Sequence, residues 1–127
     1  MKTLIINVML LPISLLLACN SKNQRTVAFI PGTYVNQAQS EYSIASDTLL
    51  LIRDEHSDNL YQIVRGTGFQ RIKDGKMQPK EYKVKTLSGI WDEAKQTLQL
   101  TQDGSILVFQ PDAQTLTIGT AIYHKLN

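Results

Sequence analysis

Few side chains in this 127-residue sequence are suited to covalent or metal chemistry. Cys19 is the only cysteine, and the two histidines, His56 and His124, are far apart in the chain. His56 lies in the acidic stretch 54–58, where carboxylates and an imidazole could share a divalent cation. The stretch lacks the alternating ligands and the central glycine of a calcium-binding loop, and its composition equally suits a solvated connection between strands. We therefore expect no metal site.

Sequence signatures of catalysis are also missing. No serine lies in a nucleophile elbow. The glycines of the 66–68 stretch are not followed by a helical pattern, so they predict a bend in a strand rather than a phosphate-binding loop. His124 shares a predicted strand face with Ile122 and Leu126, which is typical of a half-buried histidine with a local hydrogen bond. We expect neither an enzyme nor a cofactor.

The N-terminus has the pattern of a cleaved leader. Lys2 precedes an apolar run from Leu4 to Leu17, and the small residue Ala18 comes directly before Cys19. The run is too short and too one-sided for a typical transmembrane helix. The string Leu-Leu-Ala-Cys ending at Cys19 resembles the lipobox of bacterial lipoproteins. The resemblance implies that residues 1–18 are a signal peptide and that Cys19 is lipidated and becomes the first mature residue, anchoring the chain in the membrane.

Two alternatives for Cys19 remain: cleavage without lipidation, and a buried core cysteine. Residues 20–25 are polar and lack apolar periodicity, which predicts that 19–31 hold the lipidated cysteine and a flexible tether with an average span of roughly 20 Å. Asn20 after the cysteine is compatible with outer-membrane sorting, and no acidic run resembles a surface-export signal. We therefore expect an outer-membrane lipoprotein on the periplasmic face.

Residues 32–127 read as a single all-β domain. Short apolar alternations separated by turn residues predict a small antiparallel up-and-down meander of about seven or eight strands. Closure into a barrel, complete or nearly so, would remove exposed strand edges, and a two-layer sandwich is the alternative. The expected strands cover 32–35, 47–53, 60–72, 81–87, 97–101, 105–110, 115–119 and 121–126, and 89–91 either continues the strand over 81–87 or begins another. Residues 36–43 could be a short helix or a loop, and 92–96 could form one helical turn.

Basic residues gather in the middle of the chain and give the one positive indication of a binding surface. If the strands on either side of Asp74 and Gly75 pair, their faces would form a basic stripe with nearby aromatics. Such a face would suit an anionic polymer, lipid headgroups or an acidic protein, although a solvated sheet face has the same composition. A net charge of +2 gives no indication of nucleic-acid binding. Trp91 is expected in the core as well as near this stripe. The candidate residues are Arg65, Arg71, Lys83, Lys85 and Trp91.

Two resemblances bear on function. The opening Gly32-Thr33-Tyr34, followed by the meander, resembles lipocalin-like barrels, which implies a possible cavity for a small apolar ligand. The stretches 30–35, 47–49 and 68–76 resemble small uncharacterised lipoproteins of Bacteroidota, some of which accompany conjugative transposons. That resemblance implies an envelope location and suggests a conjugation-associated role. The leading hypothesis is a non-catalytic accessory or assembly domain with an envelope protein as partner, and the alternative is a lipocalin-like carrier of a small ligand.

Overall fold

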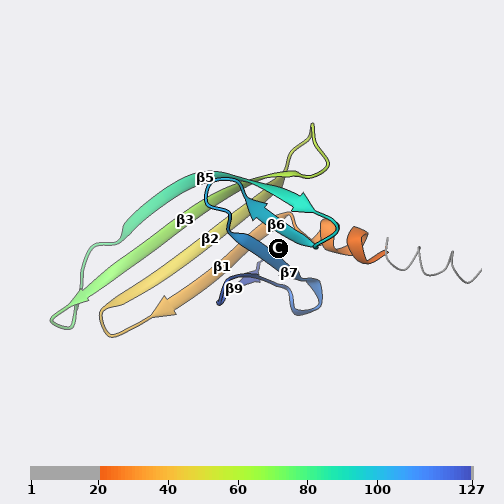
Figure 1. The fold of residues 1–127 in the computed structure, drawn as a ribbon. Coiled ribbons are helices and arrows are strands. Elements are labelled where there is room, and N and C mark those ends of the chain that lie inside the picture. Colours follow the sequence, from red (N-terminus) through yellow and green to blue (C-terminus); the bar gives the residue numbers. More distant parts are fainter. Residues whose placement is uncertain (1–20, 127) are drawn as a thin grey trace, which may run out of the picture.

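Alternating apolar and polar residues form nine strands in the computed structural model, which describes residues 21–126 (Figure 1). The elements are β1 (Gly32–Gln39), β2 (Ser43–Arg53), β3 (Leu60–Lys73), β4 (Lys76–Met77), β5 (Glu81–Asp92), β6 (Thr97–Leu100), β7 (Ile106–Gln110), the 3₁₀ turn η1 (Pro111–Ala113), β8 (Thr115–Ile118) and β9 (Ala121–Lys125). All neighbouring pairs are antiparallel. Eight strands close into a barrel because β1 pairs with both β2 and β9, and β4 pairs only with the end of β3. The predicted all-β antiparallel barrel is confirmed, and the sandwich does not form.

A helix over residues 21–29 corrects the prediction of a flexible tether. Thr26, Phe29 and Ile30 are buried, so this segment packs into one end of the barrel. A helix this short gains its stability from tertiary packing rather than from its own propensity, so its sequence, which begins with the polar residues 21–26, did not predict it. The predicted signal peptide 1–18 and Cys19 lie outside the described residues. Between residues 21 and 126 no helix combines the length and hydrophobicity needed to cross a bilayer.

The helix closes one end of the barrel with aromatic and polar contacts. The ring of Phe29 meets those of Tyr34 and Phe109 edge-on, at centroid distances of 5.8 and 6.3 Å. The Tyr34 hydroxyl lies 2.9 Å from the carbonyl oxygens of both Phe29 and Ile30, and the Lys125 ammonium also donates to the Phe29 carbonyl. These donors satisfy carbonyls that the end of a helix leaves without backbone partners. We call this part of the barrel, around residues 21–34, the closed end.

The interior of the barrel next to the closed end is filled with side chains. Trp91 is among them, as the sequence predicts, and its indole nitrogen lies 3.4 Å from Asn23 Oδ1 on the helix. Burial of these apolar side chains stabilises the domain, which cannot form an internal disulfide because the chain has one cysteine. The buried hydrophobic residues are Phe29, Ile30, Tyr34, Leu49, Leu51, Tyr61, Ile63, Trp91, Leu98, Leu100, Leu107, Phe109, Leu116 and Tyr123.

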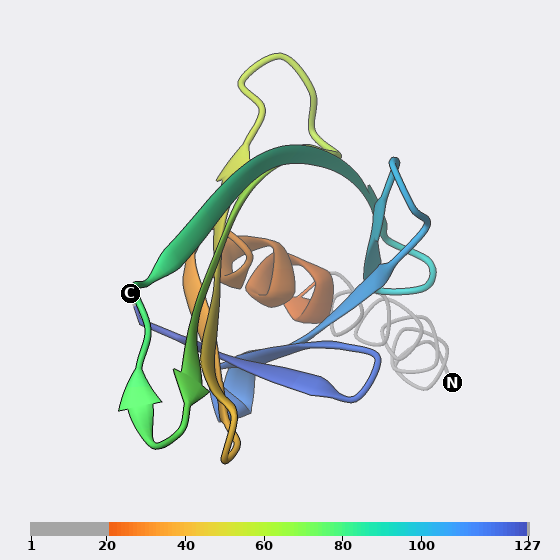
Figure 2. The same cartoon turned by 90° about the vertical axis from the view of Figure 1, so that its left-hand side faces the viewer.

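The strands differ in length, which makes the barrel asymmetric. Strands β2, β3 and β5 have 11, 14 and 12 residues, whereas β6 to β9 have 4 or 5 each. β1 last pairs with β9 at Val35, and β5 first pairs with β6 at Gly89. The long strands therefore continue beyond the short ones as a curved four-stranded sheet (Figure 1), and the view along it shows the helix at the far end (Figure 2). We call this extension, residues 36–47 and 65–87, the open half.

Two further local expectations are wrong, and one agrees with the structure. Residues 36–39 continue β1 rather than forming a helix or loop, whereas 93–96 form a turn, as expected. His124 is exposed, because in β9 it is Tyr123 that is buried and alternate residues of a strand point to opposite faces.

Candidate interaction site

Four of the predicted site residues share one face of the open half. Arg65 pairs across the sheet with Lys85, and Thr67 pairs with Lys83, so these side chains lie on the same side of β3 and β5. Arg71 follows at an even spacing from Arg65 and shares its face. The same face carries the buried Ile63 and the partly buried Leu87 further along, and it therefore continues the barrel interior rather than the outside. Trp91 lies elsewhere, in the core at the closed end.

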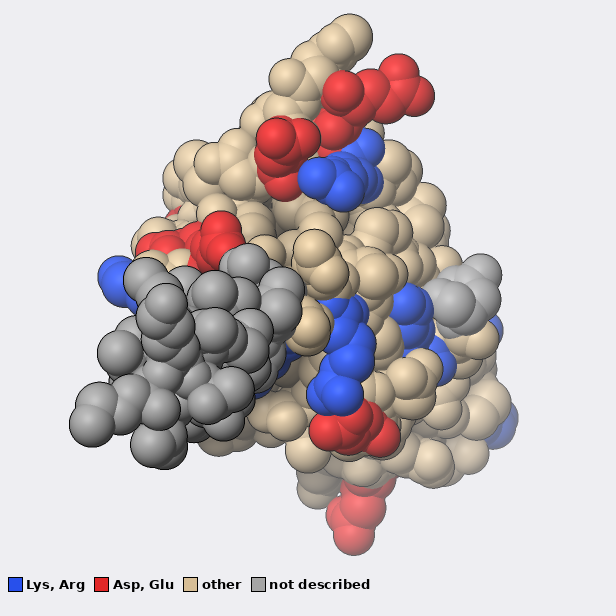
Figure 3. Space-filling model, turned by 90° about the vertical axis from the view of Figure 1, so that its right-hand side faces the viewer, with Lys and Arg blue, Asp and Glu red and all other residues tan. Residues whose placement is uncertain are grey.

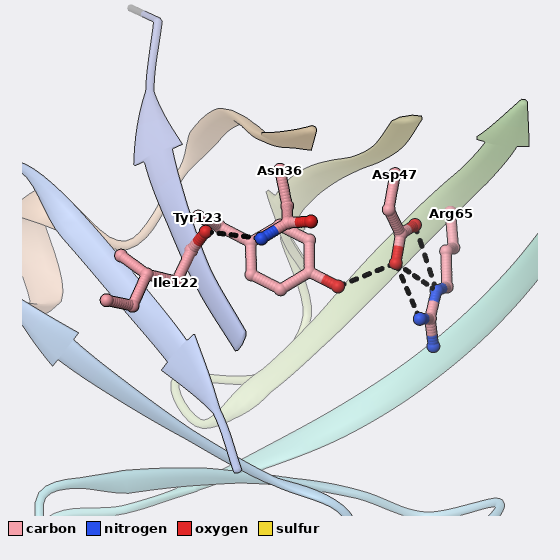
Figure 4. Close-up of polar contacts among 5 residues, drawn as sticks. All are labelled: Asn36, Asp47, Arg65, Ile122 and Tyr123. Carbon is pink, nitrogen blue, oxygen red and sulfur yellow. Dashed lines mark hydrogen bonds and ion pairs between the residues drawn. The ribbon is translucent and has the colours of Figure 1, made fainter. Parts of the chain in front are cut away.

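Arg65 is not a free cation, because it forms an ion pair with Asp47 (Figure 4). Its Nη2 lies 2.6 Å from Asp47 Oδ2, and its Nε lies 3.1 Å from both carboxylate oxygens. Such a bidentate contact is stronger and more specific in geometry than a single hydrogen bond between an arginine and a carboxylate. The hydrogen bond to Asp47 is the main cause that raises the pKa of Arg65.

Tyr123 completes a polar layer between the apolar core and the open half. Its hydroxyl donates to Asp47 Oδ2 at 2.6 Å, and Asn36 Nδ2 donates to the carbonyl oxygen of Ile122 at 2.7 Å beside it (Figure 4). Burial, helped by the hydrogen bond to Asp47, raises the pKa of Tyr123 to about 12. The layer therefore marks where the filled barrel interior ends and the polar inner face of the open half begins.

The remaining predicted cations extend beyond this layer toward solvent. Lys83 and Lys85 are exposed and belong to none of the ion pairs formed by residues 21–126. The Arg71 guanidinium lies 5.6 Å from the centre of the Phe69 ring on the same face. Glu81, opposite Phe69, is the acidic residue of β5 on this face. Beyond the Arg65–Asp47 pair, the inner face of the open half thus has an excess of positive charge.

The outer face of the open half is apolar at one place. Tyr82 pairs with Gly68, and its ring covers Gly66: a Cβ at Gly66 would lie 2.2 Å from the Tyr82 hydroxyl oxygen. Tyr82 is nevertheless 67% exposed, and Val84 next to it on this face is 59% exposed. Strand β5 therefore presents lysines on one face and exposed apolar side chains on the other.

Sequence reasoning missed Asp47 and Tyr123. The sequence placed Asp47 at the start of a strand, but its contact with Arg65 depends on register: Asp47 faces Thr67 and Leu49 faces Arg65, so the ion pair is diagonal. Tyr123 reaches the same carboxylate from the last strand, 76 residues away in sequence. The alternation in 121–126 could have indicated that Tyr123 points inward, but not what it contacts.

The histidines are not part of this site. His56 is exposed in the loop between β2 and β3, and its backbone N–H donates to Asp54 Oδ1 at 2.7 Å, which is a turn-forming contact. Within residues 21–126, no three His, Cys, Asp or Glu side chains are grouped to hold a metal ion. No protein-family model, curated protein or solved structure matches this chain.

Proposed function

We propose that this chain is a lipid-anchored lipoprotein of the bacterial cell envelope whose barrel is a non-catalytic accessory or assembly domain that acts through protein contacts. The observation that supports this best is the separation of the two ends. The helix next to the lipidation candidate Cys19 packs at the closed end, whereas the exposed, charged strands extend from the opposite end (Figures 1 and 2).

The helix changes how such an anchor would hold the domain. Only Asn20 separates Cys19 from the described helix, so the α-carbons of residues 19 and 21 are at most about 8 Å apart. A lipid on Cys19 would keep the closed end at the membrane surface, not on a tether of roughly 20 Å. The open half would then project away from the bilayer, where other envelope proteins can reach it.

The surface of the closed end fits attachment by lipid rather than by charge. In the visible part of this face, acidic and basic side chains are interspersed on a mostly uncharged surface (Figure 3). Arg25, for example, is paired with Asp112 at 3.0 Å. A mixed surface of this kind gains little from anionic headgroups, so firm attachment would depend on the acyl chains.

The filled interior favours protein contacts over the alternative, a lipocalin-like carrier of a small apolar ligand. A carrier needs an apolar cavity that encloses most of its ligand. Here the inward positions of the barrel are occupied by large side chains with no exposed surface, such as Tyr34, Leu107 and Leu116. A conjugation-associated role remains part of the proposal only through the resemblance of the sequence, and its partner would be an envelope protein on the periplasmic face of the outer membrane.

Two measurements on the full chain test the proposal. Radiolabelled palmitate should enter the wild-type protein and not Cys19→Ser, and only the wild-type protein should remain with the outer-membrane fraction. Cross-linking in native membranes should then give one reproducible adduct through a photoreactive residue at Glu81 in the open half, and none through one at Glu93 in the closed end. Equal palmitate incorporation by both proteins, or adducts only from position 93, would contradict the proposal.

A further inference from the structure

We propose that the free edge of β5, residues 81–87, binds an extended acidic segment of a partner protein, which adds to the sheet as an antiparallel strand. This inference rests on the proposed function, because it identifies the kind of partner that the open half would contact. It is carried by three observations: unpaired backbone groups along the edge, lysines on its inner face and exposed apolar side chains on its outer face.

The backbone of this edge is free to pair. Strand β5 bonds β3 along 81–90, but among residues 21–126 no strand pairs with 81–88 on its other side. Ser88 shows which groups face that side: its N–H donates to Gln102 Oε1 at 3.2 Å, and its carbonyl accepts from Thr101 N–H at 3.0 Å. Residues at even spacing from Ser88 direct their N–H and C=O the same way. The backbones of Tyr82, Val84 and Thr86 therefore form the open edge, which is the template needed for strand addition.

Side chains give the edge a preference for one kind of strand. Lys83 and Lys85 lie on the inner face without ion-pair partners among the described residues, while Tyr82 and Val84 are exposed on the outer face. Opposite charges across neighbouring strands stabilise the pairing, as do apolar pairs on the other face. Opposite residues 82–86, a segment whose acidic residues face Lys83 and Lys85 and alternate with β-branched residues would match both faces at once, whereas Glu81 at the start of the edge would repel an acidic residue.

A second copy of this chain fits the edge less well. The antiparallel register that pairs all of 81–87 with itself is centred on Val84 and sets Lys83 opposite Lys85 twice. Like charges directly opposite each other are destabilising. The lysines thus discourage pairing between copies, which is the usual role of charge on an edge strand, and the same charge selects an acidic partner.

The first test uses the full chain in detergent micelles and a capped peptide that spans residues 82–86 of the edge, in which valine and aspartate alternate and valine stands at both ends. Binding is measured by fluorescence anisotropy, with amide exchange followed by NMR. We expect protection of the Tyr82, Val84 and Thr86 amides, and weaker binding of a peptide with lysine in place of aspartate. Protection of these amides without peptide, rising with protein concentration, would instead identify a second copy as the occupant and overturn the proposal.

Methylated peptides separate strand addition from simple charge attraction. In an antiparallel addition the valines face Tyr82 and Val84, and their N–H groups bond the edge, whereas the aspartate N–H groups point away. Methylating the valine amides should abolish binding, and methylating the aspartate amides should not. Equal binding of both methylated peptides would overturn the proposal.

Two protein variants complete the test. Val84→Pro removes an N–H that faces the free edge and leaves the bonds to β3, which come from odd-numbered residues, so it should fold and lose the peptide. Val84→Thr is the matched control and should keep binding. Charge reversal in Lys83→Glu/Lys85→Glu should weaken binding of the aspartate peptide about tenfold and strengthen binding of the lysine peptide. If Val84→Pro binds the aspartate peptide as the wild type does, the edge is not the site.

The proposed function can fail separately from this inference. If wild-type protein binds the peptide along β5 but does not incorporate palmitate and gives no cross-linked envelope protein, the edge assignment stands and the accessory role is wrong. If an envelope protein is cross-linked through position 81 but Val84→Pro cross-links it equally, the accessory role stands and the edge assignment is wrong.

Discussion

The closed end and the open half are built from the same long strands but are organised differently. At the closed end, both edges of each strand are bonded to neighbours, and the interior is filled by residues such as Tyr34 and Leu107. In the open half, β1 and β5 lose their partners on one side, and the inner face is charged. The difference shows that one sheet can provide stability at one end and an accessible surface at the other, with the Asp47 layer between them.

The largest expected effect is on the free energy of unfolding, when a phenylalanine is replaced by alanine in each of the two regions. Phe29→Ala should lower the free energy of unfolding by about 3–5 kcal/mol, because its buried ring contacts Tyr34 and Phe109. Phe69→Ala removes a half-buried ring in the open half and should cost about 1 kcal/mol. Urea unfolding followed by the fluorescence of Trp91, the only tryptophan, measures both. Equal losses would show that the open half is packed as tightly as the closed end.

A substitution in the polar layer should have the next largest effect on the free energy of unfolding. Asp47→Asn removes the charge that binds Arg65 and weakens the acceptor of Tyr123, so it should cost about 1–3 kcal/mol. The matched control is Asp58→Asn, whose carboxylate lies 3.7 Å from Arg53 on the surface. A pair of that kind contributes about 0–1 kcal/mol. If Asp47→Asn lowers the free energy of unfolding no more than Asp58→Asn does, the polar layer is not a structural boundary.

Alkaline pH should act on the same layer through Tyr123. Its pKa is raised from 10.0 to about 12 in the folded protein, so the unfolded chain releases this proton first. Its contribution to stability is complete below pH 10 and is lost as the pH rises toward 12. Burial also raises the pKa of Tyr61, which adds to the loss. Urea midpoints at pH 8 and pH 11 should therefore differ less for Tyr123→Phe than for wild type, and an unchanged difference would contradict this role.

The smallest effect concerns the outer face of the open half. Gly66→Ala must displace the Tyr82 ring, which costs little because the end of an exposed side chain can move. In a Tyr82→Ala background the same substitution should be favourable, since alanine restricts the unfolded chain more than glycine does. The two changes should be coupled by about 0.5–1 kcal/mol in a double-mutant cycle. Additive effects would mean that the ring does not lie over Gly66.

The sequence was informative wherever an element follows its own local pattern. Strand alternation predicted about seven or eight of the nine strands close to their observed positions, because one side of most strands faces a filled interior. The pattern becomes weak at the tip of β1, where Gln37 and Gln39 have no apolar alternation, and that segment was misassigned. The helix over 21–29 was missed for a related reason: it buries only a few side chains, against strands that come later in the chain.

The site was partly predictable for the same physical reason. The shared face of Arg65, Lys83 and Lys85 follows from even spacing and one hairpin, which sequence can show. The neutralisation of Arg65 by Asp47 depends on the register between β2 and β3, and the free edge of β5 depends on how short β6 is. Both are properties of the assembled barrel, not of any single strand.

Position relative to the membrane tests the central claim, that the two ends have different roles, most directly. Glu93→Cys at the closed end and Glu41→Cys at the tip of the open half place one label each in a chain whose only natural cysteine is the anchor candidate. In vesicles with spin-labelled headgroups, a fluorophore at position 93 should be strongly quenched and one at position 41 should be almost unaffected. Equal quenching at the two positions, or stronger quenching at 41, would contradict the account.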